Sequence, residues 1–480
     1  MKTPIPVLEK TPFALDNAPL EGHLTSRAGA GLITRIFRSM QLPASCQANL
    51  PNHRVTSRGF TPGQYIESAC SAVLQGIDRL EDMDALRDDE ALSRVVGYQA
   101  PSARSMRDFL EKFNDEELIE KARQQAKESE LIAFIPERNA MLSGLDHVLA
   151  TSACKCAQKG EPRLTCATID ADATVVESWK RDATYAYTGV KGYQPAVAMW
   201  TEADAILAVE FRDGNVPARY QSLNVVKAAF GALPASVETL AFRGDSACYQ
   251  KELLEWLQQD EREQGPQGPI EFAVTAVMSP ELKNSCLRVS EPDWQTYDIE
   301  KDGVLRQYAE LDFVPSDTYE KKDSKPLRFV GIRIVKPQGE LFDDGLQHRH
   351  FAVCTNRATK APELLQWHRA KAGTIEHVHD ELKNALAAAA MPSKYFGANA
   401  AWFAINCIAY NLASALRASI PEPTFRTARI KRLRFHFFNM TGRIVRDRRK
   451  IRLRLAVPRE WLTILIKLFD IFALRTVSTG

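Results

Sequence analysis

The order of strand and helix patterns between residues 163 and 280 is the feature that most constrains the fold of this chain. Three β-rich runs come first, and one of them, "LTCATIDADATVV", alternates apolar and polar residues. A helix pattern, a strand, a second helix pattern and the strand "IEFAVTAV" follow. The order strand–strand–strand–helix–strand–helix–strand predicts an α/β unit, in which a sheet is covered by helices.

The region before this unit has helical spacing. Residues 25–150 place apolar side chains three and four positions apart, which predicts a mostly helical N-terminal region. Within it, residues 88–113 have the outline of a helix, a tight turn at Gly97 and a second helix with a capping-box pattern at Ser105 and Asp108. This outline fits either a DNA-binding helix-turn-helix or an ordinary corner between two helices.

The region after this unit is β-rich and then helical. Residues 281–356 carry strand patterns, with a hairpin predicted at Asp302-Gly303. They therefore read as an insertion. Helical spacing returns over residues 361–390 and again over residues 397–417, where nearly every face is apolar. A helix that is apolar on most faces is expected in the core.

Composition excludes several classes of protein. Of the 480 residues, 45% are hydrophobic and 25% are charged, as in an ordinary globular chain. The nine cysteines form no CxxC pair, so we expect reduced thiols and a cytosolic protein with no zinc cluster. We expect no signal peptide, because residues 1–16 have no apolar stretch, and no membrane span, because Lys467 and Asp470 interrupt the most apolar run, residues 461–474.

Positive charge is concentrated near the C-terminus. Residues 425–455 contain twelve Lys or Arg and one acid, which is +11 in a chain whose net charge is +2, so the remainder carries −9. Such segregation indicates a polyanionic partner, and the alternative is a solvated basic hairpin. Apolar and basic residues alternate here, which predicts a β-meander with one apolar and one cationic face.

Carboxylates follow two of the predicted strands. Asp170 and Asp172 are two residues apart on one strand, so both should project from the same face, toward a metal ion or toward solvent at a strand end. Asp245 stands where a later strand gives way to a helix. Ligands bind at this edge of open α/β sheets, although an aspartate there can also serve as a helix N-cap.

A third group of polar residues lies on the predicted helix over residues 372–386. His377 and His379 are two residues apart, which directs them to nearly opposite sides, so they do not form a zinc pair. His377 and Glu381 are expected at the solvated surface. One helical face would carry Glu376, His379, Asp380 and Lys383. That face could hold a carboxylate toward a metal and a lysine toward a phosphate, or it could be a solvated charged stripe.

Taken together, the carboxylates predict a site for hard cations. Oxygen ligands select Mg²⁺ or Mn²⁺ over zinc. Two such ions about 3.5–4 Å apart can activate a nucleophile and stabilise the leaving oxygen in phosphodiester displacement.

This arrangement resembles the ribonuclease-H-like core of DDE transposases. More narrowly, it is similar to the bacterial cut-and-paste insertion-sequence transposases that carry a β-rich insertion between the second Asp and the Glu. The similar motifs are "HLTSRAGAGLI", "IDADATVVES", "YTGVKGYQPAVAMW", "FRGDSACYQKELL", "AGTIEHVHDELKNAL" and "FGANAAWFAINCIAYNL". The spacings, 73 positions from Asp172 to Asp245 and 131 from Asp245 to Glu376, make the resemblance specific.

The resemblance implies that Asp172, Asp245 and Glu376 are the catalytic carboxylates and bind two Mg²⁺ or Mn²⁺ ions. Asp170 competes with Asp172 as the first metal ligand, and Thr174 favours Asp172 because it completes a D-x-T pattern.

The resemblance also implies DNA contacts around the third carboxylate. Lys383 completes the family's Glu-x6-Lys motif. The preceding Tyr-x2-Arg motif is replaced by His368 and Lys371, where Arg369 could substitute. Further DNA contacts are expected at Tyr193, Trp294, Arg432, Arg434, Arg448, Arg449 and Lys450.

These inferences define five expected regions. They are a helical DNA-binding region (1–155), the first part of the catalytic core (156–280), a β-rich insertion (281–356), the last part of the core (357–420) and a basic β-meander with a helix (421–480). The implied activity is metal-dependent cleavage at the element ends and strand transfer into target DNA, by a cytoplasmic, nucleoid-associated bacterial protein. The partners would be terminal inverted repeats and target DNA, with a homodimer in the DNA complex. The alternatives are an inactive DNA-binding derivative of a transposase and a hydrolytic nuclease of the same fold.

Overall fold

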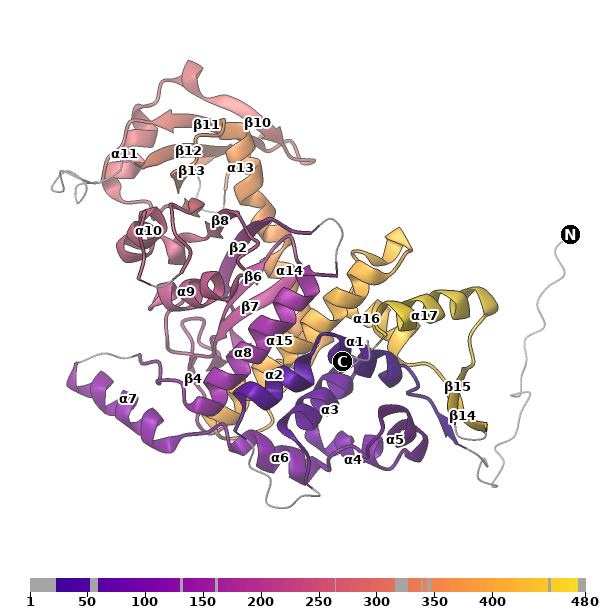
Figure 1. Ribbon diagram of the computed structural model, residues 1–480. Coiled ribbons are helices and arrows are strands. Elements are labelled where there is room, and N and C mark those ends of the chain that lie inside the picture. The colour runs from indigo at the N-terminus through magenta and orange to yellow at the C-terminus, as the bar shows by residue number, and fades with distance from the viewer. Residues whose placement is uncertain are drawn as a thin grey trace, which may run out of the picture.

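The computed structural model has a mixed sheet at its centre, with the insertion at one end and the N- and C-terminal regions side by side at the other (Figure 1). The structure describes residues 23–51, 59–129, 133–159, 163–263, 265–315, 327–337, 340–342, 347–447 and 450–473.

The core sheet is built from the strands that the β-rich runs of the sequence predicted. They are β2 (Cys166–Ala173), β6 (Ala196–Trp200), β7 (Ala205–Glu210), β8 (Thr239–Gly244) and β9 (Glu271–Thr275). Their spatial order is β7-β6-β2-β8-β9, in which β6 alone runs antiparallel to the other four. The predicted α/β class and the ribonuclease-H-like mixed sheet are confirmed by this topology.

The β-rich residues between the core segments extend the same sheet. The added strands are β10 (Gln295–Ile299), β11 (Leu305–Leu311), β12 (Arg328–Val335) and β13 (His348–Thr355), and β13 pairs with β9. The hairpin between β10 and β11 turns at Gly303, whose φ of 84° is a conformation that glycine adopts readily. All nine strands therefore form one sheet, with the insertion at its far edge (Figure 1).

Two long helices cover the core sheet. Helix α8 (Ala140–Ala157) packs against α15 (Phe396–Ser419), and both contact β7. All but the last two residues of α15 are buried, as its apolar pattern predicted. The Asn411 amide of α15 bonds to both backbone groups of Ile206, so a buried polar side chain joins helix to strand. Helices α9 (Ser222–Ala232), α10 (Lys251–Gln258) and α11 (Pro280–Arg288) complete this part of the chain.

The N-terminal region is helical, as predicted. Its helices are α1 (Ala30–Ser39), α2 (Leu42–Asn49), α3 (Pro62–Leu74), α4 (Met83–Arg87), α5 (Glu90–Val96), α6 (Ala103–Glu111) and α7 (Glu116–Glu128). Helix α5 ends at Gly97, whose φ is 95°. The N-cap of α6 is Ser102, whose hydroxyl accepts the Ser105 N–H, so the capping box expected at Ser105 and Asp108 is wrong.

The basic C-terminal region is only partly the predicted meander. Strands β14 (Gly442–Asp447) and β15 (Lys450–Leu455) form a hairpin that pairs with β1 (Leu24–Thr25). The segment before it, however, is helical, with α16 (Ile430–Leu433) followed by a π-helix at Arg434–Phe438. Ile430, Leu433 and Phe437 are buried there, at a spacing that fits helical turns.

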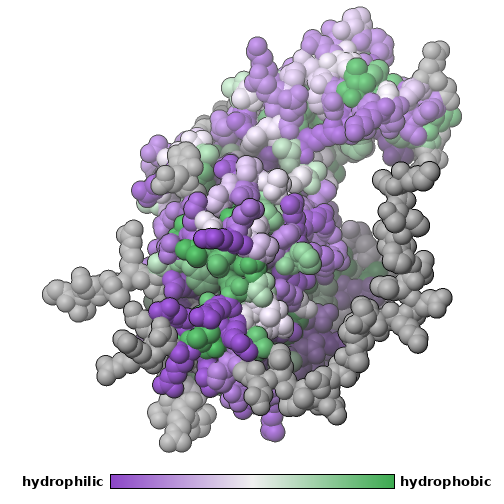
Figure 2. All heavy atoms as spheres, turned by 90° about the vertical axis from the view of Figure 1, so that its right-hand side faces the viewer, coloured by the Kyte–Doolittle hydropathy of each residue, from purple (hydrophilic) through white to green (hydrophobic). Residues whose placement is uncertain are grey.

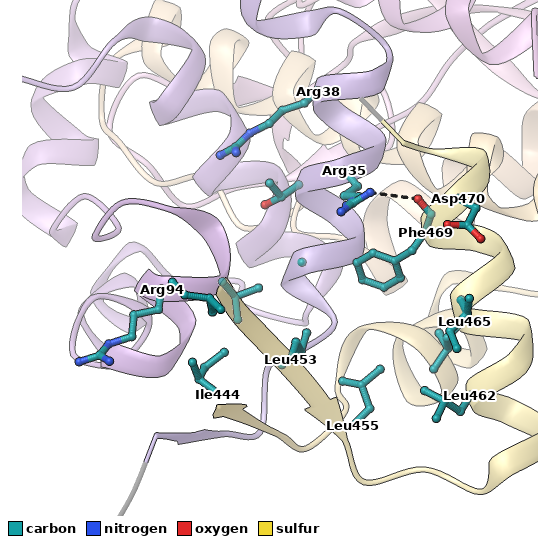
Figure 3. Close-up of a pocket in the computed structure, with 15 residues that line it drawn as sticks. Arg35, Arg38, Arg94, Ile444, Leu453, Leu455, Leu462, Leu465, Phe469 and Asp470 are labelled. Atoms are coloured by element: carbon teal, nitrogen blue, oxygen red, sulfur yellow. Dashed lines mark hydrogen bonds between the residues drawn. The ribbon is translucent and has the colours of Figure 1, made fainter. Parts of the chain in front are cut away.

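The hairpin lies over helix α17 (Arg459–Ile471) and helix α1, and a cavity of about 520 Å³ separates them (Figure 3). Its wall is mostly apolar, with Leu453, Leu465 and Phe469 among the lining residues, and Arg35 donates a hydrogen bond to the Phe469 carbonyl. The same side of the molecule shows hydrophobic patches among hydrophilic side chains (Figure 2).

Three further short strands, β3 (Val176–Glu177), β4 (Thr184–Tyr185) and β5 (Lys191–Tyr193), form a small sheet beyond the end of β2. All nine cysteines are free thiols, as predicted. Across the described ranges, no helix has the length and apolar character that a membrane crossing requires.

Candidate active site

Two aspartates end adjacent parallel strands of the core sheet. The parallel register of β2 and β8 sets Asp170 opposite Arg243. Asp172 and Asp245 each follow two residues later, so the same register brings them side by side where the strands end. This is the edge of the sheet where open α/β folds bind ligands.

Asp170 is a structural residue in this arrangement. Its carboxylate is fully buried and accepts two hydrogen bonds of 2.7 Å from the Arg243 guanidinium. The hydroxyls of Thr201 and Thr374 also donate to it. Both carboxylate oxygens are therefore engaged, which corrects the alternative that Asp170 is the metal ligand and leaves Asp172 as the candidate.

The same ion pair fixes the helical segment that carries Glu376. Arg243 donates a further bond to the carbonyl of Trp367 in α13 (Ala361–Arg369), at 2.7 Å. Thr374 precedes α14 (Ile375–Asp380) and donates to Asp170. The buried pair thus joins both central strands to both helices of this segment.

A lysine lies near the two aspartates at the strand ends. The ammonium of Lys371, itself mostly buried, is 3.7 Å from Asp172 Oδ2. Burial raises the pKa of Asp245 above its ordinary value, the Lys371 ammonium opposes this shift, and the Asp172 carboxylate adds to it. The two carboxylates therefore repel one another in a partly desolvated space that favours a cation.

Helix α14 closes the site from above the strand ends. The side chain of His379 is 7% exposed, and its Nε2 lies 3.8 Å from Asp172 Oδ2. Burial and the nearby lysines lower the pKa of His379 to about 3, so the ring is uncharged and the contact is not an ion pair. Lys383 Nζ donates a 2.9 Å hydrogen bond to Thr174, just past β2.

Glu376 is in the first turn of α14, three residues before His379 and hence on the same side of the helix. Its side chain is exposed, and it makes no ion pair with any residue that the structure describes. Glu376 thus lies one turn from the contact between His379 and Asp172.

Two neighbours of Glu376 differ from expectation. Asp380 does not share the face toward the site, because it bonds to Arg429 and Asn384. Glu381 is not a surface residue, since it is 1% exposed and accepts the backbone N–H of Ile430. A π-helix at Glu381–Ala385 follows α14 directly, and its wider turn alters the positions that a regular helix would give.

The residues in place of the Tyr-x2-Arg motif point inward or toward the insertion. His368 Nε2 lies 3.1 Å from the Gly244 carbonyl, and burial lowers its pKa to about 4. Arg369 forms ion pairs with Asp298 and Glu300, next to the first strand of the insertion. His368 therefore packs against the core, and Arg369 ties α13 to the insertion.

Two other expected DNA contacts, Tyr193 and Trp294, are buried, and a third, Arg434, is half-buried with its guanidinium bonded to backbone carbonyls, which corrects their assignment. Tyr193 is fully buried and bonds to Asn399. The ring of Trp294 is 6% exposed, with the Arg333 guanidinium 4.8 Å from its centroid. Arg434 donates to carbonyl groups of α3 and of the π-helix after α14.

The remaining expected contacts lie in the C-terminal region. Arg432 is exposed and stacks over Phe425, 4.5 Å from the ring centroid. Arg448 and Arg449 lie outside the described residues, and of Lys450 the backbone alone is described.

The side chains at this site are of a kind that binds a divalent ion, although the candidate ligands do not all lie close together. The carboxylates of Asp172 and Asp245 repel each other, so a cation between them would be favourable. Carboxylate oxygens are also the donors that hard ions prefer. No three acidic, histidine or cysteine side chains within the described ranges converge on one metal position. Asp172 and Asp245 are adjacent, and Glu376 remains outside the pair.

Sequence reasoning missed the partner of Asp170. The signal was present, because Arg243 precedes Asp245 by the same two residues by which Asp170 precedes Asp172. On parallel strands, equal spacings of this kind bring both pairs into register.

One known protein family matches the chain over nearly its whole length. The family profile described as transposase DDE domain group 1 matches residues 20–475. No curated protein matches the chain significantly. A solved structure, the piggyBac transposase synaptic complex with hairpin DNA, is similar at 8% identity and a TM-score of 0.43, covering 94% of this chain and 83% of that one. On the family match, the chain belongs to the DDE transposases, enzymes that cleave DNA and transfer it to a new site.

Proposed function

We propose that Asp172, Asp245 and Glu376 are the three catalytic carboxylates of this transposase. The observation that carries the proposal is the pair of mutually repelling aspartates at the ends of adjacent parallel strands, with α14 packed beside them. We leave Asp170 out of the set because its carboxylate is engaged in a buried ion pair with Arg243. We include Glu376 because it lies on the same side of α14 as His379, whose ring is close to Asp172.

We propose that this site takes two Mg²⁺ or Mn²⁺ ions. When bound, such ions lower the pKa of an attacking water or hydroxyl and stabilise the leaving oxygen. Asp172 and Asp245 would hold them, and Glu376 would complete the ligand set. Before the ions bind, the ammonium of Lys371 would balance part of the negative charge of the two aspartates, as it does in the structure.

The chain's own residues would orient the DNA. The Thr174 hydroxyl fixes Lys383 just past the end of β2, where its ammonium would contact the phosphate that flanks the scissile bond. In the first step water attacks a phosphodiester at the element end, which releases a 3′-hydroxyl. In the second step that hydroxyl attacks a phosphodiester of target DNA.

The C-terminal hairpin would bind DNA backbone. Arg443 and Arg454 are opposite each other on one face of β14 and β15, and both are exposed. Ile444 and Leu453 form the opposite, apolar face, which lines the cavity toward α17. A cationic strand face held in place by an apolar one suits phosphate contacts at terminal inverted repeats.

We further propose a bacterial insertion sequence as the element and a homodimer as the DNA-bound state, because two ends must be brought together. The nine free thiols support a reducing compartment such as the cytoplasm.

The test uses the purified full-length chain, Mg²⁺ and a duplex containing the DNA that flanks its own gene. We expect cleavage and joining by the wild type, and a loss of at least about 100-fold in Asp245→Asn and Glu376→Gln. Glu363→Gln on α13 is the matched control, an exposed acid outside the site, and it should retain activity.

Cleavage by Asp245→Asn at the wild-type rate would contradict the assignment. Cleavage without joining would identify a hydrolytic nuclease. Binding of the duplex without cleavage by the wild type would identify an inactive DNA-binding derivative.

A further inference from the structure

One side chain at the site has polar atoms with no partner. Both ring nitrogens of His379 are buried, and neither has a hydrogen-bond partner among the described residues. Buried polar groups in native proteins almost always have a partner, so each exception requires an explanation. An imidazole whose two nitrogens are both unsatisfied indicates a partner that is not part of the described chain.

The surroundings of His379 restrict what that partner can be. Its Nε2 lies 3.8 Å from Asp172 Oδ2, which is beyond hydrogen-bond reach. A neutral imidazole keeps a lone pair on one ring nitrogen, and that nitrogen can bind a metal ion. A neutral imidazole beside a carboxylate is a metal-ligating combination.

The distance is compatible with a shared ion. Protein nitrogen and oxygen ligands lie about 2.0–2.2 Å from small divalent ions, so two ligands of one ion can be up to about 4.4 Å apart. The 3.8 Å between His379 Nε2 and Asp172 Oδ2 is within that limit.

The position of the ring is also well fixed. His379 is on α14 between Val378 and Leu382, which are buried in the core together with Ile375. The neighbouring His377 is only half-buried and is directed elsewhere by the helical turn. The two histidines therefore provide a test residue and a matched control within three positions.

We propose that His379 is a nitrogen ligand of the divalent ion held by Asp172, so that the site has mixed oxygen and nitrogen ligands. This inference rests on the proposed metal-dependent function and replaces the oxygen-only ligand set that the sequence suggested. Imidazole ligands favour transition ions over Mg²⁺. The wild-type site should accordingly bind Mn²⁺ more tightly than Mg²⁺.

The decisive measurement is electron spin-echo spectroscopy of Mn²⁺ bound to the full-length chain without DNA. A coordinated imidazole nitrogen gives a ¹⁴N modulation that oxygen ligands do not give. We expect this modulation in the wild type and in His377→Gln, and its loss in His379→Gln. Circular dichroism of each variant verifies that it is folded.

Mn²⁺ and Mg²⁺ affinities supply a second readout. His379→Gln should weaken Mn²⁺ binding about 10-fold or more and Mg²⁺ binding by less, which narrows the difference between the two ions. His377→Gln should leave both affinities unchanged. Asp172→Asn should weaken both ions.

The outcomes separate this inference from the proposed function. If bound Mn²⁺ depends on Asp172 but shows no ¹⁴N modulation in the wild type, the histidine ligand is refuted and the carboxylate assignment stands. Modulation that persists in His379→Gln also refutes it, since another nitrogen is then the ligand. If no Mn²⁺ binding depends on Asp172, the inference fails, and the cleavage assay with Asp245→Asn decides separately whether the proposed function fails too.

Discussion

Replacing Asp170 with asparagine should destabilise the protein severely, although asparagine has nearly the same shape. The wild-type carboxylate is fully buried and accepts two 2.7 Å bonds from Arg243, which is itself 2% exposed. Asparagine removes the negative charge and leaves the guanidinium buried without a counter-ion. Breaking a buried ion pair in this way costs about 3–5 kcal/mol.

This cost is large relative to the stability of a typical domain, which is about 5–15 kcal/mol. The substitution should also loosen α13 and α14, because Arg243 donates a bond to the Trp367 carbonyl of α13 and Asp170 accepts one from Thr374 just before α14. The matched variant is Asp172→Asn. Asp172 is 20% exposed and its closest cation is 3.7 Å away, so its loss should change stability by less than about 1 kcal/mol.

Urea denaturation of metal-free protein, followed by far-UV circular dichroism, measures both free energies of unfolding. The cleavage assay on the same preparations then separates the two roles. We expect Asp170→Asn to be unstable and Asp172→Asn to be stable but inactive. If Asp170→Asn were as stable as the wild type and inactive, Asp170 would be the ligand and the reasoning from its buried ion pair would be refuted.

Three further predictions concern other buried or charged groups. Burial raises the pKa of Asp213 from 3.8 to about 7, so the stability that its protonated form contributes is present below about pH 4 and is lost as pH rises to 7. Asp213→Asn should therefore increase the free energy of unfolding at pH 8 and not at pH 4. Urea denaturation at the two pH values measures this change. Glu381→Ala should lower the free energy of unfolding by about 1–3 kcal/mol in the same assay, because it leaves the buried N–H of Ile430 without an acceptor. Arg443→Gln and Arg454→Gln should each reduce the slope of log affinity against log salt by about 0.9 in a DNA-binding titration; an unchanged slope would exclude these side chains from phosphate contact.

The core strands could be predicted from the sequence because their signal is local. Apolar and polar residues alternate in β2, whereas β6 and β7 are short, nearly continuous apolar runs, and both patterns are typical of strands. What could not be read is that β13 pairs with β9, which merges the insertion with the core into one sheet. That pairing joins distant segments, and no local pattern specifies it.

The C-terminal error shows where a local signal becomes ambiguous. Leu433, Phe435 and Phe437 alternate with basic residues, which predicted a strand. The segment is helical, and Leu433 and Phe437 are buried while Phe435 is 77% exposed. Residues four apart lie on one face of a helix and also on one face of a strand, so over so few residues both periods fit. Packing against the rest of the fold decided between them.

The aspartates that the sequence left unresolved acquire different roles through their neighbours. Asp170 and Asp172 share a strand face, yet Arg243 stands opposite the first and Asp245 opposite the second when the register is continued. Holding two like charges at adjacent strand ends is unfavourable: burial raises the pKa of Asp245, and the Asp172 carboxylate adds to that shift. The buried ion pair two residues earlier fixes the same two strands with opposite charges. The ion pair between Asp170 and Arg243 thus holds together the two strands whose ends carry the repelling carboxylates of Asp172 and Asp245. In this way a fold can keep two carboxylates in position to bind a cation.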